Sequence, residues 1–142
     1  MQPSILHPSL ESLANGFPYL IFYLLLVTAI YVAGLFIYVK LTPHKEIELI
    51  QQGNMAAAIS FSGLIIGLAL PLAACLIMKI GLMDVLVWGV VSVLLQLFLF
   101  RLTDIIFSGL PKRIADDEVP AATVLAAFKL AGSIILAVAI AG

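Results

Sequence analysis

Four uninterrupted apolar runs constrain the fold of this sequence more than any other feature. They cover Phe17–Val39, Met55–Met78, Leu82–Phe100 and Ala121–Ala141. A helix needs about 20 apolar residues to cross the hydrocarbon core of a bilayer, and each run has about that length. Continuous runs also exclude a transmembrane barrel, because barrel strands alternate apolar and polar residues. The sequence therefore predicts an all-α integral membrane protein with four transmembrane helices.

Composition and charge are typical of a chain embedded in a lipid bilayer. Hydrophobic residues make up 63% of the sequence and charged residues only 11%, whereas soluble domains have about 45–50% and 25%. The net charge of −1 gives no reason to expect a nucleic-acid partner. Cys75 is the single cysteine, and His7 and His44 lie in different predicted loops. We therefore expect no intrachain disulfide, bound metal or cofactor.

The chain reads as a single membrane domain over residues 1–142. Residues 1–16 contain no lysine or arginine, so the positive segment of a signal peptide is missing. The run Phe17–Val39 is also longer than the apolar part of a signal peptide. We expect it to be a permanent transmembrane helix.

Basic residues in the loops predict the orientation. Five of them lie in the two long loops, at Lys40, Lys45, Arg101, Lys112 and Arg113, and one lies on the opposite side, at Lys79. Cytoplasmic loops carry the excess of lysine and arginine in membrane proteins. We therefore expect both long loops in the cytoplasm and both termini outside.

The layout also predicts a repeat of two helical hairpins, over residues 1–78 and 79–142. Each half contains a span, a polar loop and a second span. An offset of 65 residues pairs Met55–Leu68 with Pro120–Ser133 and aligns Gly67 with Gly132. Both hairpins point the same way, which makes this a parallel repeat.

The first long loop carries a distinctive motif. Thr42 and Pro43 suit the N-cap and first position of a short helix. Ile47 and Ile50 stand three residues apart, with Glu46 and Glu48 beside them, which is typical of a short amphipathic helix at the membrane interface. Gly53 would end that helix, and Asn54 would cap the next span.

This motif carries a resemblance to a known family. The run Leu-Thr-Pro-x-x-Glu-Ile-Glu-Leu-Ile-x-x-Gly-Asn-x-Ala-Ala-Ala-Ile-x-Phe-x-Gly, which ends at Gly63, resembles the YjfL-like bacterial inner-membrane proteins. That family is catalogued as domain of unknown function 350. The resemblance implies a small inner-membrane protein with four spans in two repeated hairpins, and no established enzymatic activity. The second half departs from the family pattern, because Asp116–Pro120 replaces a second Gly-Asn turn.

Lys129 is the most unusual residue within the spans. It lies nine residues into the fourth span, roughly 14 Å deep at 1.5 Å per residue. A lysine at that depth is costly and normally faces protein or water. Polar residues at a similar depth could surround it, namely Ser92, Gln96, Ser60 and Thr28. The cluster could form an ion, proton or anionic-ligand site, or Lys129 could simply bond to a neighbouring span or reach toward the interface.

Small and aromatic residues predict packing and anchoring. The spacing of Gly63 and Gly67 lets helices approach closely, and Gly132 is the matching residue of the second half. Tyr19, Tyr23 and Tyr38 fall near the ends of the first span, where aromatic side chains anchor helices at the interface.

Two functions remain open, and neither is enzymatic. The sequence contains no nucleophile–base set, phosphate loop or carboxylate pair within the spans. The first hypothesis is an oligomeric membrane assembly or adaptor subunit that presents its loops to a cytoplasmic protein. The alternative is an oligomeric channel or transporter for a small ion, with its polar site around Lys129.

Overall fold

The computed structural model describes residues 7–42, 45–78 and 81–142. Within these ranges the chain forms helices and no strands. The elements in order are α1 (Pro8–Leu41), α2 (Glu46–Gln51), α3 (Met55–Ile77), α4 (Leu82–Ile106), α5 (Leu110–Ala115) and α6 (Val119–Ala141). Four of the described helices, α1, α3, α4 and α6, are long and apolar enough to cross a membrane. The prediction of an all-α protein with four membrane-spanning helices is therefore confirmed.

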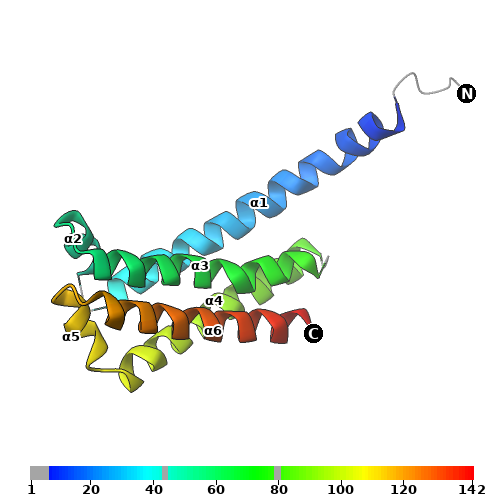
Figure 1. The fold of residues 1–142 in the computed structure, drawn as a ribbon. Coiled ribbons are helices and arrows are strands. Elements are labelled where there is room, and N and C mark those ends of the chain that lie inside the picture. The colour runs from blue at the N-terminus through cyan, green and yellow to red at the C-terminus, as the bar shows by residue number, and fades with distance from the viewer. Residues whose placement is uncertain (1–6, 43–44, 79–80) are drawn as a thin grey trace, which may run out of the picture.

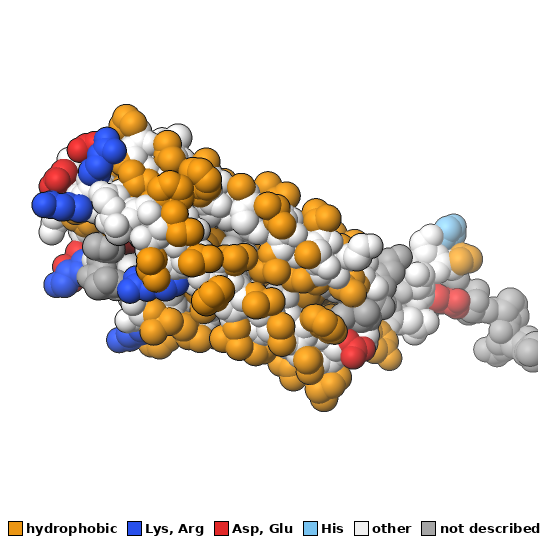
Figure 2. Space-filling view, turned by 90° about the horizontal axis from the view of Figure 1, so that it is seen from below, with side chains coloured by type: hydrophobic (Ala, Val, Ile, Leu, Met, Phe, Trp, Pro, Cys, Tyr) orange, Lys and Arg blue, Asp and Glu red, His pale blue; other side chains and the backbone are white. Residues whose placement is uncertain are grey.

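The four long helices run in alternating directions. Helices α1 and α4 run toward the end of the bundle that carries the short helices α2 and α5, and α3 and α6 run away from it (Figure 1). We call the end with α2 and α5 the loop end. Most charged side chains gather there, while hydrophobic side chains cover the flanks of the bundle (Figure 2). This distribution suits a protein whose flanks face lipid.

Helices α3 and α6 lie side by side and form the tightest contact in the bundle (Figure 1). Small residues allow this contact. A Cβ atom added at Gly63 would lie 2.7 Å from the Cβ atom of Ala126, and one added at Gly67 would lie 2.6 Å from Ser133 Oγ. The predicted packing of Gly63 and Gly67 is therefore found. A Cβ at Gly132 would meet nothing within 4 Å, so among the described residues Gly132 is not at a close helix contact of this kind.

Helix α1 packs against the bundle only in its second half. Its buried residues are Ile30, Gly34 and Tyr38, and its first half diverges from the other helices (Figure 1). A diverging helix would expose apolar surface to water in a soluble protein. In a bilayer the lipid tails cover that surface, so close packing along the whole helix is not needed.

The boundaries of two helices differ from those predicted. Helix α1 begins nine residues before the predicted span at Phe17, and α4 continues six residues beyond Phe100 to Ile106. Both extensions carry polar residues that a hydropathy argument assigns to loops. The extension of α4 matters for the site, because it contains Asp104.

The loop motif folds partly as predicted. Gly53 has a φ of 85°, and Asn54 caps α3 by accepting a hydrogen bond from Ala57 N at 2.6 Å. The prediction for Thr42 was wrong: it ends α1, where its hydroxyl donates to the carbonyl of Tyr38 at 2.9 Å, and α2 begins later, at Glu46. A threonine hydroxyl satisfies a free carbonyl at a helix end as readily as a free N–H at a helix start. Pro43, and Lys79 of the orientation argument, lie outside the described residues.

The positions of the helix ends can be compared between the two halves of the predicted repeat. Helices α5 and α6 have the same lengths as α2 and α3 and follow them by 64 residues at each boundary. This spacing differs by one residue from the offset of 65 predicted from the letters. Equal lengths and directions support two related hairpins, and the repeat itself stays a prediction.

Candidate functional site

The ammonium of Lys129 is at the centre of a buried cluster near the loop end. Its Nζ atom lies 3.1 Å from a carboxylate oxygen of Asp104 and donates to the hydroxyl of Tyr38 at 3.1 Å. The rings of Tyr38 and Phe100 lie 5.3 Å and 5.8 Å from the same nitrogen. The Lys129 side chain is only 1% exposed. The cluster therefore joins α6 to α4 and α1 through one buried charge.

The direction of the Lys129 side chain explains its partners. Side chains on a helix tilt toward the helix N-terminus, and α6 begins at the loop end. The ammonium is therefore carried from mid-bundle toward Asp104, which lies in the last turn of α4. Sequence depth alone pointed to partners at the level of the Lys129 backbone, because it did not account for this tilt.

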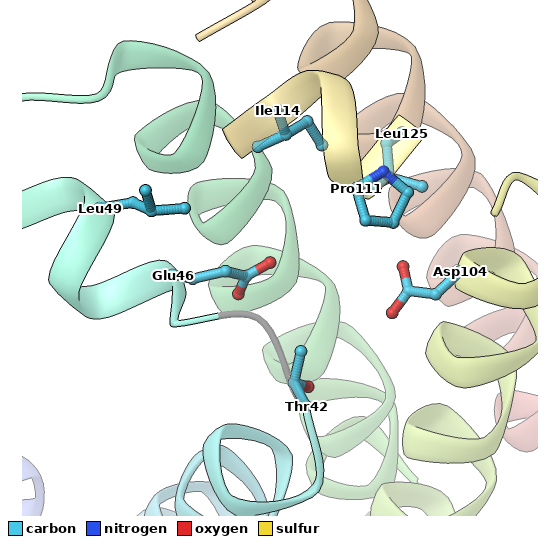
Figure 3. A pocket seen from close by; sticks show the side chains of 7 residues that line it. All are labelled: Thr42, Glu46, Leu49, Asp104, Pro111, Ile114 and Leu125. Atoms are coloured by element: carbon cyan, nitrogen blue, oxygen red, sulfur yellow. The ribbon is translucent and has the colours of Figure 1, made fainter. Parts of the chain in front are cut away.

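A second carboxylate faces the cluster from outside the spans. Glu46 Oε1 accepts a hydrogen bond from the hydroxyl of Tyr38 at 3.5 Å. Glu46 on α2 and Asp104 on α4 point into the same pocket from opposite sides (Figure 3). The volume of this pocket is about 10 Å³, close to the smallest volume that holds a water molecule. A larger cavity of about 160 Å³ lies beside Glu46, between α1 and α2.

Burial and the neighbouring charges both change the pKa of Glu46. Burial raises the pKa of its carboxyl above the ordinary 4.5, and the negative charge of Asp104 raises it further. The Lys129 ammonium and the Tyr38 hydroxyl lower the pKa. Burial is the largest of these effects, so Glu46 holds its proton to a higher pH than an exposed glutamate.

Polar residues predicted around Lys129 occupy three different places. Gln96 Nε2 donates to Ser133 Oγ at 2.7 Å, and Ser133 Oγ donates to the carbonyl of Lys129 at 2.7 Å. Gln96 is therefore linked to the Lys129 backbone and not to its ammonium. Ser92 bonds to the carbonyl of Trp88, one turn back on its own helix.

The other two predicted residues are farther from the cluster. Ser60 is fully buried on α3, and its hydroxyl has no hydrogen-bond partner among the described residues. Thr28 lines an open groove between α1 and α3. Neither residue has a described contact with the Lys129 ammonium.

Sequence reasoning missed Asp104 and the role of Tyr38. Asp104 was assigned to a loop, and Tyr38 to an interfacial belt. Tyr38 is instead buried, with its ring edge-on to Phe100 at 6.2 Å. One signal could have identified Asp104: it lies eight residues after Gln96, on the same helical face.

The loop motif of the first half contributes to a second polar contact, between the two hairpins. Asn54 Nδ2 donates to the carbonyls of Ile114 and Ala115 at 3.0 and 3.2 Å. A carboxylate oxygen of Asp117 accepts from Ala56 N at 2.9 Å. Two turns far apart in sequence thus hold the α3 N-terminus, which fixes α3 and α6 at the loop end. Glu48 lies away from this contact and pairs with Lys45 on the surface at 3.1 Å.

Comparison with known proteins gives one family. The family described as Domain of Unknown Function (DUF350) matches residues 12–140. The inner membrane protein YjfL (UPF0719) of Escherichia coli K12 is 32% identical over 112 residues, which are 79% of this chain and 85% of that protein. The protein of the same name from Escherichia coli O157:H7 matches equally well. No solved structure matches the chain. The match along nearly the whole sequence, together with four apolar helices, shows that the chain is a multi-pass inner-membrane protein that belongs to the DUF350 family.

Proposed function

We propose that this protein is an ion-handling membrane protein whose buried lysine cluster binds and releases a proton at the loop end. One observation carries the proposal: two carboxylates, Glu46 and Asp104, line the same small pocket, and the single ammonium beside them, from Lys129, pairs with Asp104. With every group ionised the three residues have one excess negative charge. Such a charge is unfavourable in a site this buried, and a proton on Glu46 removes it.

The position of Glu46 supports exchange with water. Glu46 is half-buried, and it also lines the cavity of about 160 Å³ between α1 and α2. Lys129 and Asp104 lie deeper, with side chains 1% and 10% exposed. A proton can therefore reach Glu46 from the loop end, while Asp104 stays paired with Lys129. Ionisable residues inside membrane proteins mark proton and ion pathways in general.

Infrared titration of the purified protein in lipid tests this proposal. A protonated carboxyl absorbs at a different frequency from a carboxylate, so the proton on Glu46 is directly visible. We expect a carboxyl band that persists above pH 4.5, the ordinary value, and that Glu46→Gln removes. Lys129→Met should shift its titration to higher pH, because the ammonium lowers the pKa of Glu46.

Glu48→Gln is the matched control. Glu48 lies two residues away on the same short helix, and its side chain is 56% exposed. This variant should leave the band unchanged. The proposal is wrong if the band is absent from the wild-type protein or survives Glu46→Gln.

As a second proposal, the protein forms oligomers and presents its loop end to a cytoplasmic protein. Exposed Ile47 on α2 and exposed Lys112 on α5 support it, since both lie at the loop end and are available to another protein. Other residues that suggested the hypothesis, including Glu46 and Asn54, are used in contacts within the chain. Cross-linking in native membranes, with and without Ile47→Ser, would detect such a partner. The cytoplasmic position of the loop end rests on the count of basic residues and belongs to the same proposal.

A further inference from the structure

The hydroxyl of Tyr38 lies between two groups that can carry a proton. On one side it accepts a hydrogen bond from Lys129 Nζ at 3.1 Å, and on the other it donates to Glu46 Oε1 at 3.5 Å. An ammonium can release a proton, a hydroxyl can accept one and donate another, and a carboxylate can take one up. Side chains from α6, α1 and α2 thus form a continuous series of hydrogen bonds from the buried ammonium to the loop end.

Asp104 does not provide an equivalent bond to the ammonium. Its Oδ1 atom lies 3.1 Å from Lys129 Nζ, yet it accepts no hydrogen bond among the described residues. Within the part of the chain that the structure describes, the ammonium donates one hydrogen bond, to Tyr38. Asp104 therefore stabilises the charge of Lys129, while Tyr38 provides the bond along which a proton can leave.

The outer end of this series reaches a cavity large enough for water. Tyr38 and Glu46 both line the cavity between α1 and α2, whose volume of about 160 Å³ holds several water molecules. The other charged residues that line it, Lys45 and Glu48, pair with each other at 3.1 Å. Lys129 does not line this cavity, and its side chain is 1% exposed. The Tyr38 hydroxyl is thus the contact that connects the ammonium to the water-accessible carboxylate.

We infer that Tyr38 relays protons between Lys129 and Glu46, so that the buried ammonium exchanges its protons with the loop end. The inference rests on the proposed function, which makes Glu46 the proton-binding group there. An N–H bond of the ammonium breaks as the tyrosine oxygen takes that proton, and the tyrosine O–H bond breaks as Glu46 takes the hydroxyl proton. Lysine becomes a neutral amine, glutamate becomes a neutral carboxyl, and the hydroxyl keeps one proton. The reverse transfer restores both charges, and nothing is oxidised or reduced.

Hydrogen exchange at the Lys129 ammonium tests the relay, because repeated transfers, with rotation of the hydroxyl and the ammonium between them, replace the lysine protons by those of water. NMR of the whole protein in lipid bicelles, with a heavy nitrogen isotope in its lysine side chains, records the exchange rate, and Lys129→Met identifies the signal. We expect Tyr38→Phe to slow the exchange about tenfold. It removes only the hydroxyl and keeps the ring that contacts Phe100 and the ammonium. Glu46→Gln should slow the exchange similarly, since an amide does not take up the proton.

Two variants are matched controls. Tyr31→Phe removes the hydroxyl of another tyrosine of α1, which donates to the carbonyl of Ile65, and Glu48→Gln changes the exposed glutamate of α2. Both should leave the exchange at Lys129 unchanged. The sign of the effect separates a relay from a structural role, because loss of a merely structural bond loosens the cluster and speeds exchange with water.

Circular dichroism and gel filtration identify variants that fail to fold, and if Tyr38→Phe is one of them, Glu46→Gln provides the test. The inference is overturned if the exchange at Lys129 is unchanged or faster in folded Tyr38→Phe, or unchanged in Glu46→Gln. Such a result together with an infrared band from Glu46 would leave the proposed proton site intact. Absence of that band from the wild-type protein would overturn the proposed function and the relay with it.

Discussion

Helices α3 and α6 have equal lengths and run side by side in the same direction, yet the two glycines that the predicted offset of 65 residues pairs have different surroundings. Gly67 of α3 packs against Ser133 and Phe100, whereas Gly132 of α6 faces open space. The predicted repeat aligns these two glycines. Each hairpin therefore supplies a similar scaffold, while the packing inside it depends on which side of the bundle it occupies.

The turns before the two helices differ in the same way. Gly53 and Asp117 both have a positive φ, of 85° and 61°. Asn54 then caps its own helix and reaches the other hairpin, while Glu118 makes no capping bond and pairs with Arg113 at 2.6 Å. The N-terminus of α3 thus has a side-chain cap and bonds to the other hairpin, whereas that of α6 has no side-chain cap among the described residues. The bonds that hold the two helices together at the loop end therefore all run to Asn54 or to the N-terminus of α3, and Lys129 of α6 adds the buried cluster.

Loss of the buried charge should have the largest effect. Lys129→Met leaves Asp104 buried without its cation, and breaking a buried ion pair costs about 3–5 kcal/mol. Denaturation in mixed micelles measures the free energy of unfolding. The double variant Lys129→Met/Asp104→Asn should recover much of the loss, because no charge is then left unpaired. Equal destabilisation in the single and double variants would contradict the ion pair as the cause.

The glycine pair should give the next largest difference. Gly67→Leu should destabilise the protein by about 2 kcal/mol, because a side chain there overlaps Ser133 and Phe100 and overpacking costs about 1–3 kcal/mol. Gly132→Leu should change stability by no more than about 0.5 kcal/mol, as at an open surface site. The same denaturation assay compares the two. Similar losses would mean that the second hairpin makes contacts absent from a single chain, as an oligomer would.

The turn residues should differ by a smaller amount. Asn54→Ala removes an N-cap and two bonds to the other hairpin, and a cap alone contributes about 0.5–2 kcal/mol. Glu118→Ala removes only a surface ion pair, worth about 0–1 kcal/mol. Thermal unfolding of the two variants, each compared with the wild type, measures the difference. A larger loss from Glu118→Ala would contradict the greater contribution of the Asn54 turn.

Glu46 should produce the smallest effect, visible as a pH dependence. Its pKa is raised in the folded protein, so its contribution to stability is present below pH 4.5 and is lost as the pH rises through the folded value. The groups that face it are Tyr38, Asp104 and Lys129. Glu46→Gln should therefore make the thermal midpoint less dependent on pH in this range. An unchanged pH profile would show that Glu46 titrates as an exposed acid.

Hydropathy and local chemistry predicted the parts of the fold that depend on neighbouring residues. The four spans, the turn at Gly53 and the cap at Asn54 all follow from short stretches of sequence, because lipid requires apolar helices and each turn follows local rules. The ends of α1 and α4 were predicted less well. A helix can continue beyond its apolar run wherever its polar residues find partners, as Asp104 does.

The sequence by itself determined that the chain is helical, crosses the membrane and buries a lysine that needs a partner. Only the tertiary structure decided which partner that is. Three features bring Lys129 together with Asp104, Tyr38 and Glu46. The Lys129 side chain tilts toward the loop end, α4 continues beyond its apolar run, and α2 lies at the loop end beside α1. Lys129, Asp104 and the pair Tyr38 and Glu46 come from three separate parts of the sequence, and an ion pair depends on the distance between charges in space. No pattern of apolar residues along the chain records that distance.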